Sequence, residues 1–521
     1  MSNPFFEPLT ETGVPAFDKI EFRHYAEAID RGFAEHDAEI AEIIANPQAP
    51  DFANTVEALE RTGALLRRVF NVFWNMASTD TSEELQALER VVEPQYAVHQ
   101  GRITSDPALF KRIRAVVDAA ETLDAQQRQL LQQTYNKFVR SGAELSDKDR
   151  ARVNVIGEQL ALNTTQFGQN VLQDTNQFEL VLEEGQELCG LPKFALAMAS
   201  AEAASRGMPG KFVFTLSRSS VTPFLQYAQR RDLREKIYRA YTECGVSSVD
   251  NRPIIREIVA LRDERARLLG YASHAHYMLD DRMAKTPQAV RKLLDQVWAP
   301  CQKRVAAEAA DLQAAIRAEG GSFELEPWDW WYYTEKVRQQ RFDFDEEAVK
   351  PYLRLENVRD GVFDVAGKLY GITFSRRADI PVYHPEVQAF EVREADGALI
   401  GYFLFDFYMR PSKRGGAWMS EFRGQSELDG HVHPVIVNCC NFPKSDPCLL
   451  GMDEVTTLFH EFGHALHQML SDVTYEMVSG TSVPRDFVEL PSQLYEHWLE
   501  VPDVLQKFAT HAETGATLHQ D

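Results

Sequence analysis

The sequence predicts a mainly α-helical protein that carries a small β-sheet directly before its strongest chemical motif. Apolar residues repeat at helical spacing through most of the first 380 residues, beginning with Tyr25, Ile29 and Phe33. Strand-like runs dominate only after that point. We therefore expect a mainly helical body over residues 1–380 and a catalytic region with the sheet over residues 381–521.

Length, composition and charge exclude several classes of protein. The chain has 521 residues, of which 44% are hydrophobic and 26% charged, so it can bury a large core and is not disordered. Its formal net charge of −23 is the wrong sign for a nucleic-acid partner. No apolar run approaches the roughly 18 residues of a membrane span, and the six cysteines are scattered. We expect a cytoplasmic protein without nucleic acid or membrane as partner.

Helix starts and a sheet can be placed from local signals. Ser146 with Asp149, and Thr286 with Pro287, are typical N-termini of long helices. The segments VQAFEVR and LIGYFLFDFY flank the turn Asp396-Gly397 and predict a hairpin, and HPVIVNCC (433–440) predicts a further strand.

The strongest chemical signal is the segment DEVTTLFHEFGHALHQML. We expect it to form an amphipathic helix with Asp453 as N-cap. The segment contains HExxH, in which His460 and His464 are one helical turn apart on one face, so both imidazoles can bind one zinc ion. Glu461 lies about 100° further round the helix and is offset to hold a water on the metal.

A catalytic zinc ion needs a third protein ligand, and the spacing leaves the choice open. Downstream acids are followed by a second expected helix, for which Asp486 is a plausible N-cap, and either Asp486 or Glu489 fits as ligand. His467 competes as a ligand, although a role behind the ligands or in packing is favoured. The pair His431 and His433 fits a plain strand better than a separate metal site.

Two stretches resemble the thimet oligopeptidase family of zinc metallopeptidases, peptidase family M3. These are HEFGHALH (460–467) and SGTSVPRDFVELPSQ (479–493). Upstream, RGGAWM (414–419), PWDWWYYTEKVR (327–338), IPVYHPEV and NPFFEP look most like its bacterial peptidyl-dipeptidase branch. The resemblance implies His460, His464 and Glu489 as ligands of one zinc ion per chain, with Glu461 as general base.

The resemblance also implies a fold and a reaction. The family fold is elongated, mostly helical and two-lobed, with a deep channel that admits short peptides and works in a monomer. The reaction is release of C-terminal dipeptides, and the alternative is internal cleavage by an oligoendopeptidase. Gly415 and Gly416 belong to a stretch that faces the substrate in the family, although a tight glycine turn explains them equally well.

One departure from the family pattern concerns the C-terminal end. Only 57 residues follow His464, whereas family members continue into a helical segment with a His and Tyr cluster that stabilises the oxyanion. We therefore expect a C-terminally truncated chain, and a catalytically silent metal- or peptide-binding protein is a further alternative.

Overall fold

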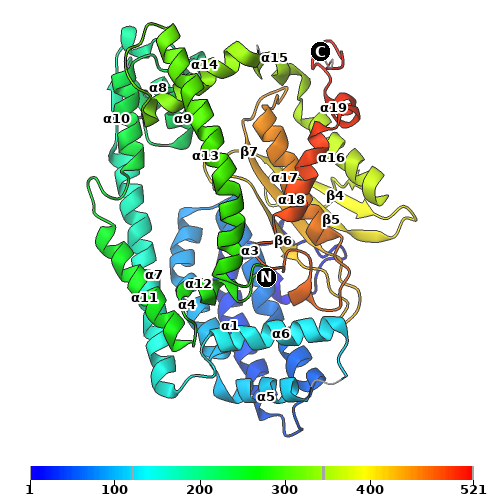
Figure 1. Ribbon diagram of the computed structural model, residues 1–521. Coiled ribbons are helices and arrows are strands. Elements are labelled where there is room, and N and C mark those ends of the chain that lie inside the picture. Colours follow the sequence, from blue (N-terminus) through cyan, green and yellow to red (C-terminus); the bar gives the residue numbers. More distant parts are fainter. Residues whose placement is uncertain (1, 120–121, 343–345, 519–521) are drawn as a thin grey trace. The chain divides into compact units, whose positions relative to one another are not determined.

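The computed structural model describes residues 2–119, 122–342 and 346–518 and is mainly α-helical with a small sheet, as predicted (Figure 1). The chain divides into two compact units, which are described separately. The first comprises Met1–Glu144, Asp281–Met283 and Glu346–Asp521, and the second Leu145–Asp280 and Ala284–Asp345. The expected division into a mainly helical body over residues 1–380 and a catalytic region over residues 381–521 stays a prediction. Within the described residues, no helix combines the length and apolar character that a membrane span needs.

The first unit combines helices from both ends of the chain with the larger sheet. Its helices are α1 (Arg23–Ala45), α2 (Ala58–Arg61), α3 (Ala64–Thr79), α4 (Glu83–Thr104), α5 (Pro107–Asp118), α6 (Ala125–Arg140), α15 (Glu346–Val349), α16 (Leu355–Tyr370), α17 (Met452–Met469), α18 (Leu490–Glu496) and α19 (Pro502–Phe508). Its strands are β3 (Thr373–Arg376), β4 (Gln388–Arg393), β5 (Leu399–Tyr408), β6 (Trp418–Arg423) and β7 (Val435–Phe442), in the order β3-β4-β5-β7-β6.

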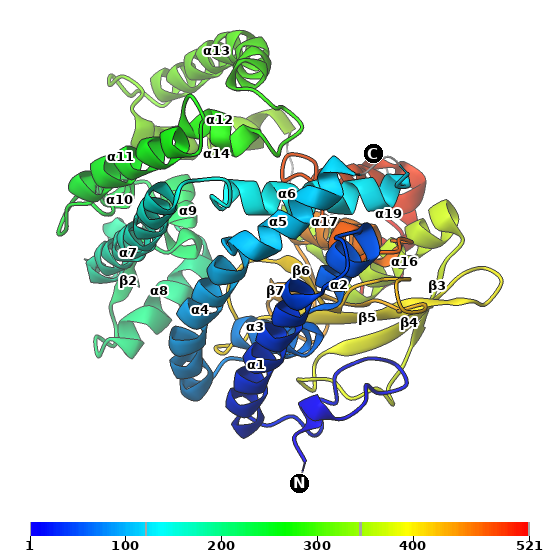
Figure 2. The ribbon, with the colours of Figure 1, turned by 90° about the horizontal axis from the view of Figure 1, so that it is seen from below.

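The sheet lies between two helical layers. Strands β5 and β7 are parallel and the other neighbours antiparallel. Helices α16 and α17 cover one face of the sheet, and α1 and α3 the other (Figure 2). Alternate residues of β5 face these two layers: Phe403 packs into the core with α16 and α17, and Leu404 into the core with α1 and α3. Burial on both faces explains why β5 is almost continuously apolar in sequence. The strand β6 is left at the edge of the sheet next to β7.

The expected strands form where the sequence places them. β4 and β5 pair as a hairpin, and Gly397 at its turn has φ +91°, a conformation that suits glycine. The predicted strand 433–440 corresponds to β7, Val435–Phe442. The hairpin and strand predictions are confirmed, and both elements lie in the unit that carries the HExxH helix.

The second unit is a helical assembly with one short strand pair. Its elements are α7 (Asp147–Gln177), β1 (Leu180–Leu182), α8 (Lys193–Ser205), β2 (Phe212–Phe214), α9 (Arg218–Tyr227), α10 (Arg231–Thr242), α11 (Arg252–Leu268), α12 (His274–Leu279), α13 (Pro287–Ala318) and α14 (Trp330–Phe342). Both predicted helix starts are confirmed: Ser146 accepts a hydrogen bond from the Asp149 amide, and Thr286 from the Ala289 amide.

A candidate metal centre

The HExxH segment forms α17 and packs its apolar stripe into the core. Leu458 and Phe462 are fully buried, and Leu466 nearly so. The N-cap is Gly451, so the expectation that Asp453 caps the helix is wrong. The reason is local: Glu454 reaches back and accepts a hydrogen bond from the Gly451 amide at 2.7 Å, which starts the helix two residues earlier.

Two histidines from α17 meet a glutamate from the start of α18. The Nε2 atoms of His460 and His464 lie 3.2 and 3.0 Å from Oε2 of Glu489. The three residues form the one group of three or more His, Cys, Asp or Glu in the described part of the chain whose possible ligand atoms all lie within 4.8 Å. The structure thus brings together the three side chains that the resemblance implied.

A glycine inside the motif allows the second helix to come this close. A Cβ on Gly463 would lie 2.7 Å from Cα of Ser492 and 2.9 Å from the carbonyl oxygen of Pro491, both in α18. Atoms at such distances would have to move apart, because core packing leaves no slack. Glycine at this position therefore lets α18 pack on α17 and brings Glu489 within reach of the histidines.

The alternative third ligand, Asp486, lies elsewhere. Its Oδ1 accepts a hydrogen bond from the Met283 amide at 3.0 Å, and Glu489 itself occupies the N-cap position of α18. The expectation that Asp486 caps this helix is wrong, because the helix begins three residues later. Ser492 donates to Oε2 of Glu489 at 3.1 Å and so fixes the carboxylate. Sequence reasoning did not single out this serine.

A further carboxylate orients one of the histidines. Nδ1 of His460 lies 2.6 Å from Oε1 of Glu496. A carboxylate at this distance accepts a hydrogen bond from the protonated Nδ1. The lone pair is then on Nε2, the nitrogen that faces Glu489. Sequence reasoning assigned no role to Glu496. The signal that identifies it is its place seven residues after Glu489, which puts both on the segment that packs against α17.

Glu461 projects to another side of α17 and is only 6% exposed. Burial raises the pKa of Glu461 to about 7, although the neighbouring His460 and a hydrogen bond from the Met419 amide act in the opposite direction. Met419 belongs to the edge strand β6. A carboxyl group with a pKa near neutrality can both accept and return a proton, which is the property of a general base that later acts as an acid.

The weaker histidine candidates from the sequence are not members of this three-residue group. The His467 ring packs 6.2 Å from that of Phe487, and its buried Nδ1 has no hydrogen-bond partner in the described residues. Burial lowers the pKa of His467 and of His464. His431 and His433 contact each other, with Nε2 and Nδ1 3.1 Å apart, and are not part of the three-residue group.

Gly415 and Gly416 lie in the exposed segment that precedes β6. Neither would meet a neighbouring atom with a Cβ, and Gly416 has φ +94°. Asn441 donates to the Gly416 carbonyl at 2.7 Å. The segment is exposed and its backbone is fixed by the hydrogen bond from Asn441. Both a substrate-facing stretch and a tight glycine turn fit this arrangement.

The donor set fits zinc. Two imidazole nitrogens and one carboxylate oxygen are typical ligands of a catalytic zinc ion, which keeps a fourth position open. Ligand atoms bound tetrahedrally at ~2.0–2.1 Å lie about 3.3 Å apart, close to the 3.2 and 3.0 Å that separate Glu489 from the two histidines. His460, His464 and Glu489 are therefore the residues that would hold the ion.

Comparison with known proteins identifies the family. A sequence model described as Peptidase family M3 matches residues 224–521, which include α17 and α18. The chain belongs to peptidase family M3. The peptidase is 39% identical to dipeptidyl carboxypeptidase of Escherichia coli (strain K12), over 99% of this chain and 77% of that protein. It is 34% identical to oligopeptidase A of Salmonella typhimurium, over 100% of this chain and 78% of that protein.

A solved structure was also found to be similar to the peptidase. It is of a putative Oligoendopeptidase F, at 14% identity and a TM-score of 0.47, and covers 92% of this chain and 69% of that one.

Proposed function

We propose that this chain is a zinc-dependent peptidyl-dipeptidase, which removes dipeptides from the C-terminus of short peptides. The observation that supports it most is the convergence of His460, His464 and Glu489, with Glu461 beside them. When bound, zinc would lower the pKa of a coordinated water and polarise the scissile carbonyl. Glu461 would accept the proton from the attacking water and return it to the leaving amine.

The 39% identity to a dipeptidyl carboxypeptidase favours release of dipeptides, and the similarity to oligopeptidase A favours internal cleavage as second candidate. Mass spectrometry of the products distinguishes them. A peptidyl-dipeptidase yields successive C-terminal dipeptides, and amidation of the substrate's C-terminus blocks it. An oligoendopeptidase cuts internally and tolerates the amide.

The role of Glu461 provides the test of the mechanism. Glu461→Gln should keep one zinc ion per chain and lose about 10²- to 10⁴-fold in kcat, because the base is removed and the ligands stay. Glu454→Gln, on the same helix and still able to cap it, is the matched control and should keep wild-type kcat. Zinc content and hydrolysis of a quenched peptide are measured together. Zinc bound without any hydrolysis by the wild-type chain would support the catalytically silent alternative.

The surroundings of the reaction are part of the same proposal. We place the enzyme in the cytoplasm as a monomer that binds short peptides in a channel too narrow for folded proteins. Gly415 and Gly416 would pair with the extended peptide through their backbone, since neither residue has a Cβ that would block the approach. His467 would support the ligands from behind.

A further inference from the structure

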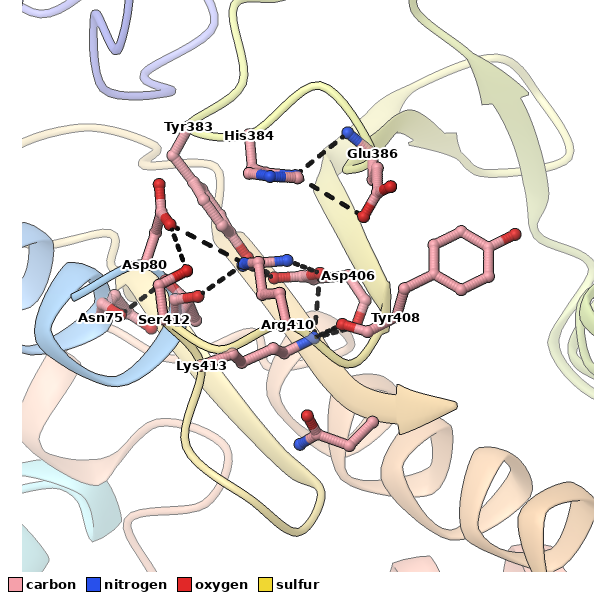
Figure 3. A network of polar contacts seen from close by, with 12 residues as sticks. Asn75, Asp80, Tyr383, His384, Glu386, Asp406, Tyr408, Arg410, Ser412 and Lys413 are labelled. Atoms are coloured by element: carbon pink, nitrogen blue, oxygen red, sulfur yellow. Dashed lines mark hydrogen bonds and ion pairs between the residues drawn. The ribbon is translucent and has the colours of Figure 1, made fainter. Parts of the chain in front are cut away.

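A second polar cluster, separate from the three metal ligands, lies at the end of β5 (Figure 3). Its centre is the fully buried side chain of Asp406. The carboxylate accepts two hydrogen bonds from Arg410, at 2.8 and 2.6 Å, and one from Tyr383 at 2.8 Å. The ammonium of Lys413 lies 2.9 Å from Oδ1 and is also buried. Both carboxylate oxygens are therefore paired, chiefly with cations from the segment that leaves β5.

The two cations tie this segment to its surroundings. Nζ of Lys413 donates to the carbonyl oxygens of Asp406 and Tyr408, at 2.9 and 3.0 Å. Nε of Arg410 donates to the carbonyl oxygen of Thr79 at 2.9 Å, at the end of α3. Each cation thus joins the Asp406 carboxylate to main-chain carbonyls, so that one buried charge holds several points of backbone.

Main-chain bonds extend the connection to α3. The Thr81 amide donates to the Ser412 carbonyl at 2.8 Å, and the Arg414 amide to the Ser78 carbonyl at 2.8 Å. Ser412 Oγ donates to Asp80 at 2.7 Å. The segment 409–417 therefore follows the end of α3 as a fixed strip, although it is largely exposed.

The strip leads directly into the edge strand beside the candidate general base. Asn441 donates to the carbonyl oxygens of Arg414 and Gly416, at 2.8 and 2.7 Å. The chain then enters β6 at Trp418, and β6 packs on α17, where Gln468 donates to Oε2 of Glu421 at 2.6 Å. The amide of Met419, the second residue of β6, lies near enough to the Glu461 carboxylate to lower its pKa. The position of the Met419 amide therefore depends on the conformation of the segment 409–417, which precedes it.

We propose that Asp406 is a positioning residue for peptide hydrolysis. Through Arg410 and Lys413 it holds the segment 409–417, so that the Met419 amide meets Glu461 and the backbone at Gly416 is presented to the peptide. This inference rests on the proposed function, because it assigns the network a task in the same reaction. It adds a residue that touches neither substrate nor metal, and whose charge acts through the main chain.

The chain offers a matched control for the loss of a buried ion pair. Asp329 in the second unit is also fully buried and pairs with two cations, Arg231 and Arg234, at 2.8 Å each. Replacing either aspartate by asparagine leaves cations unpaired and lowers stability. Only Asp406 connects to the strip before β6, so only its replacement should change the reaction.

The experiment compares Asp406→Asn with Asp329→Asn in the full chain. For Asp406→Asn we expect unchanged zinc content and a kcat about 10²-fold below wild type, the cost of a displacement of order 1 Å at a catalytic group. Hydrogen exchange at the Met419 amide should become faster. Asp329→Asn should keep kcat within about threefold and Met419 exchange at the wild-type rate. Equal kcat or equal Met419 exchange in the two variants would overturn the proposal.

A double variant separates positioning from stability. Asp406→Asn with Lys413→Met removes the uncompensated ammonium and keeps its apolar stem, so the melting temperature should return toward wild type. The kcat should stay low, because the double variant lacks both the Asp406 carboxylate and the bonds from Lys413 to the main chain. Recovery of kcat together with the melting temperature would refute the positioning role. If the wild-type chain hydrolyses no peptide, the proposed function fails, and the Met419 exchange rates still decide whether Asp406 fixes the strip.

Discussion

Two kinds of carboxylate cluster occur in this molecule, and Asp329 in the second unit and Glu489 in the first show how they differ in the pairing of their oxygens. Asp329 is fully buried and receives its hydrogen bonds from the guanidinium groups of Arg231 and Arg234, so charge and bonds are satisfied within the protein. Glu489 is 54% exposed and its Oε2 faces the Nε2 atoms of two histidines. All three of these atoms can serve as ligands of one metal ion.

The difference provides a way to distinguish structural from functional groups. In a buried ion pair whose carboxylate oxygens all accept hydrogen bonds from the protein, no ligand is needed to balance the charge. Its effect on stability shows when one partner is removed, because the other charge is then buried without a partner. Three converging ligand atoms are instead suited to bind a metal ion from outside the protein. Replacements in the two clusters should therefore have opposite signatures in stability and in metal binding.

The largest effect is expected for Glu489→Ala. Replacing a carboxylate that only hydrogen-bonds to a metal ligand lowers metal affinity roughly 10- to 100-fold. Removing one of the three ligands themselves should lower zinc affinity by more than this and abolish hydrolysis. The stability of the metal-free protein should change little, because the Glu489 side chain is 54% exposed and its contacts with Ser492 and the two histidines are screened by solvent. Zinc titration and urea unfolding after chelation measure the two quantities. A strongly destabilised metal-free variant would mean that the cluster is structural.

Asp329→Asn should show the reverse pattern. Breaking a buried ion pair costs about 3–5 kcal/mol because it leaves the charges of Arg231 and Arg234 uncompensated. Zinc affinity should match wild type, since none of the three ligands contacts this cluster. Chemical unfolding gives the first number and zinc titration the second. Reduced zinc binding in the folded variant would contradict the separation of the two clusters.

A smaller effect is expected for Glu496→Gln. The amide keeps the size of the side chain but accepts a weaker hydrogen bond from His460 Nδ1, so zinc affinity should fall by about 10- to 100-fold. Glu500→Gln is the control, because the Glu500 side chain is 82% exposed and its contact with Nδ1 of His497 is long, at 3.9 Å. Competition with a chromophoric chelator measures both. Equal affinities would show that Glu496 does not orient the imidazole.

The sequence predicted those parts of the site that follow from helical periodicity. His460 and His464 are placed by the geometry of one helix, and the hairpin before them by alternation and a turn glycine. The choice of Glu489 over Asp486 needed either the resemblance or the packing of α18 on α17. That packing depends on Gly463, and spacing gives no measure of how closely two helices approach.

The remaining parts of the site come from contacts between distant segments. Asp406 and Thr79 are far apart in the sequence, and no local pattern predicts that Arg410 joins them. The expected capping residue of α17 was also wrong by two positions, because the hydrogen bond that the Gly451 amide donates to Glu454, rather than capping propensity, sets the start of the helix. Boundaries and tertiary contacts are decided by competition among neighbours that sequence reasoning cannot rank.

The smallest effect concerns the pH dependence of the Asp406 cluster, which should resemble a structural ion pair rather than the metal group. Burial alone would raise the pKa of Asp406, but Arg410 and Lys413 more than offset this and hold it below the usual value of 3.8. The folded state therefore binds this proton only at lower pH than the unfolded chain. The contribution to the free energy of unfolding is complete above about pH 4 and decreases as the pH falls through the folded pKa.

The difference in unfolding free energy between wild type and Asp406→Asn, from urea titrations at pH 7, 4 and 3, should stay constant down to about pH 4 and shrink below it. A difference that grows on acidification would mean that Asp406 is protonated in the folded protein, and that the cations are held by other groups.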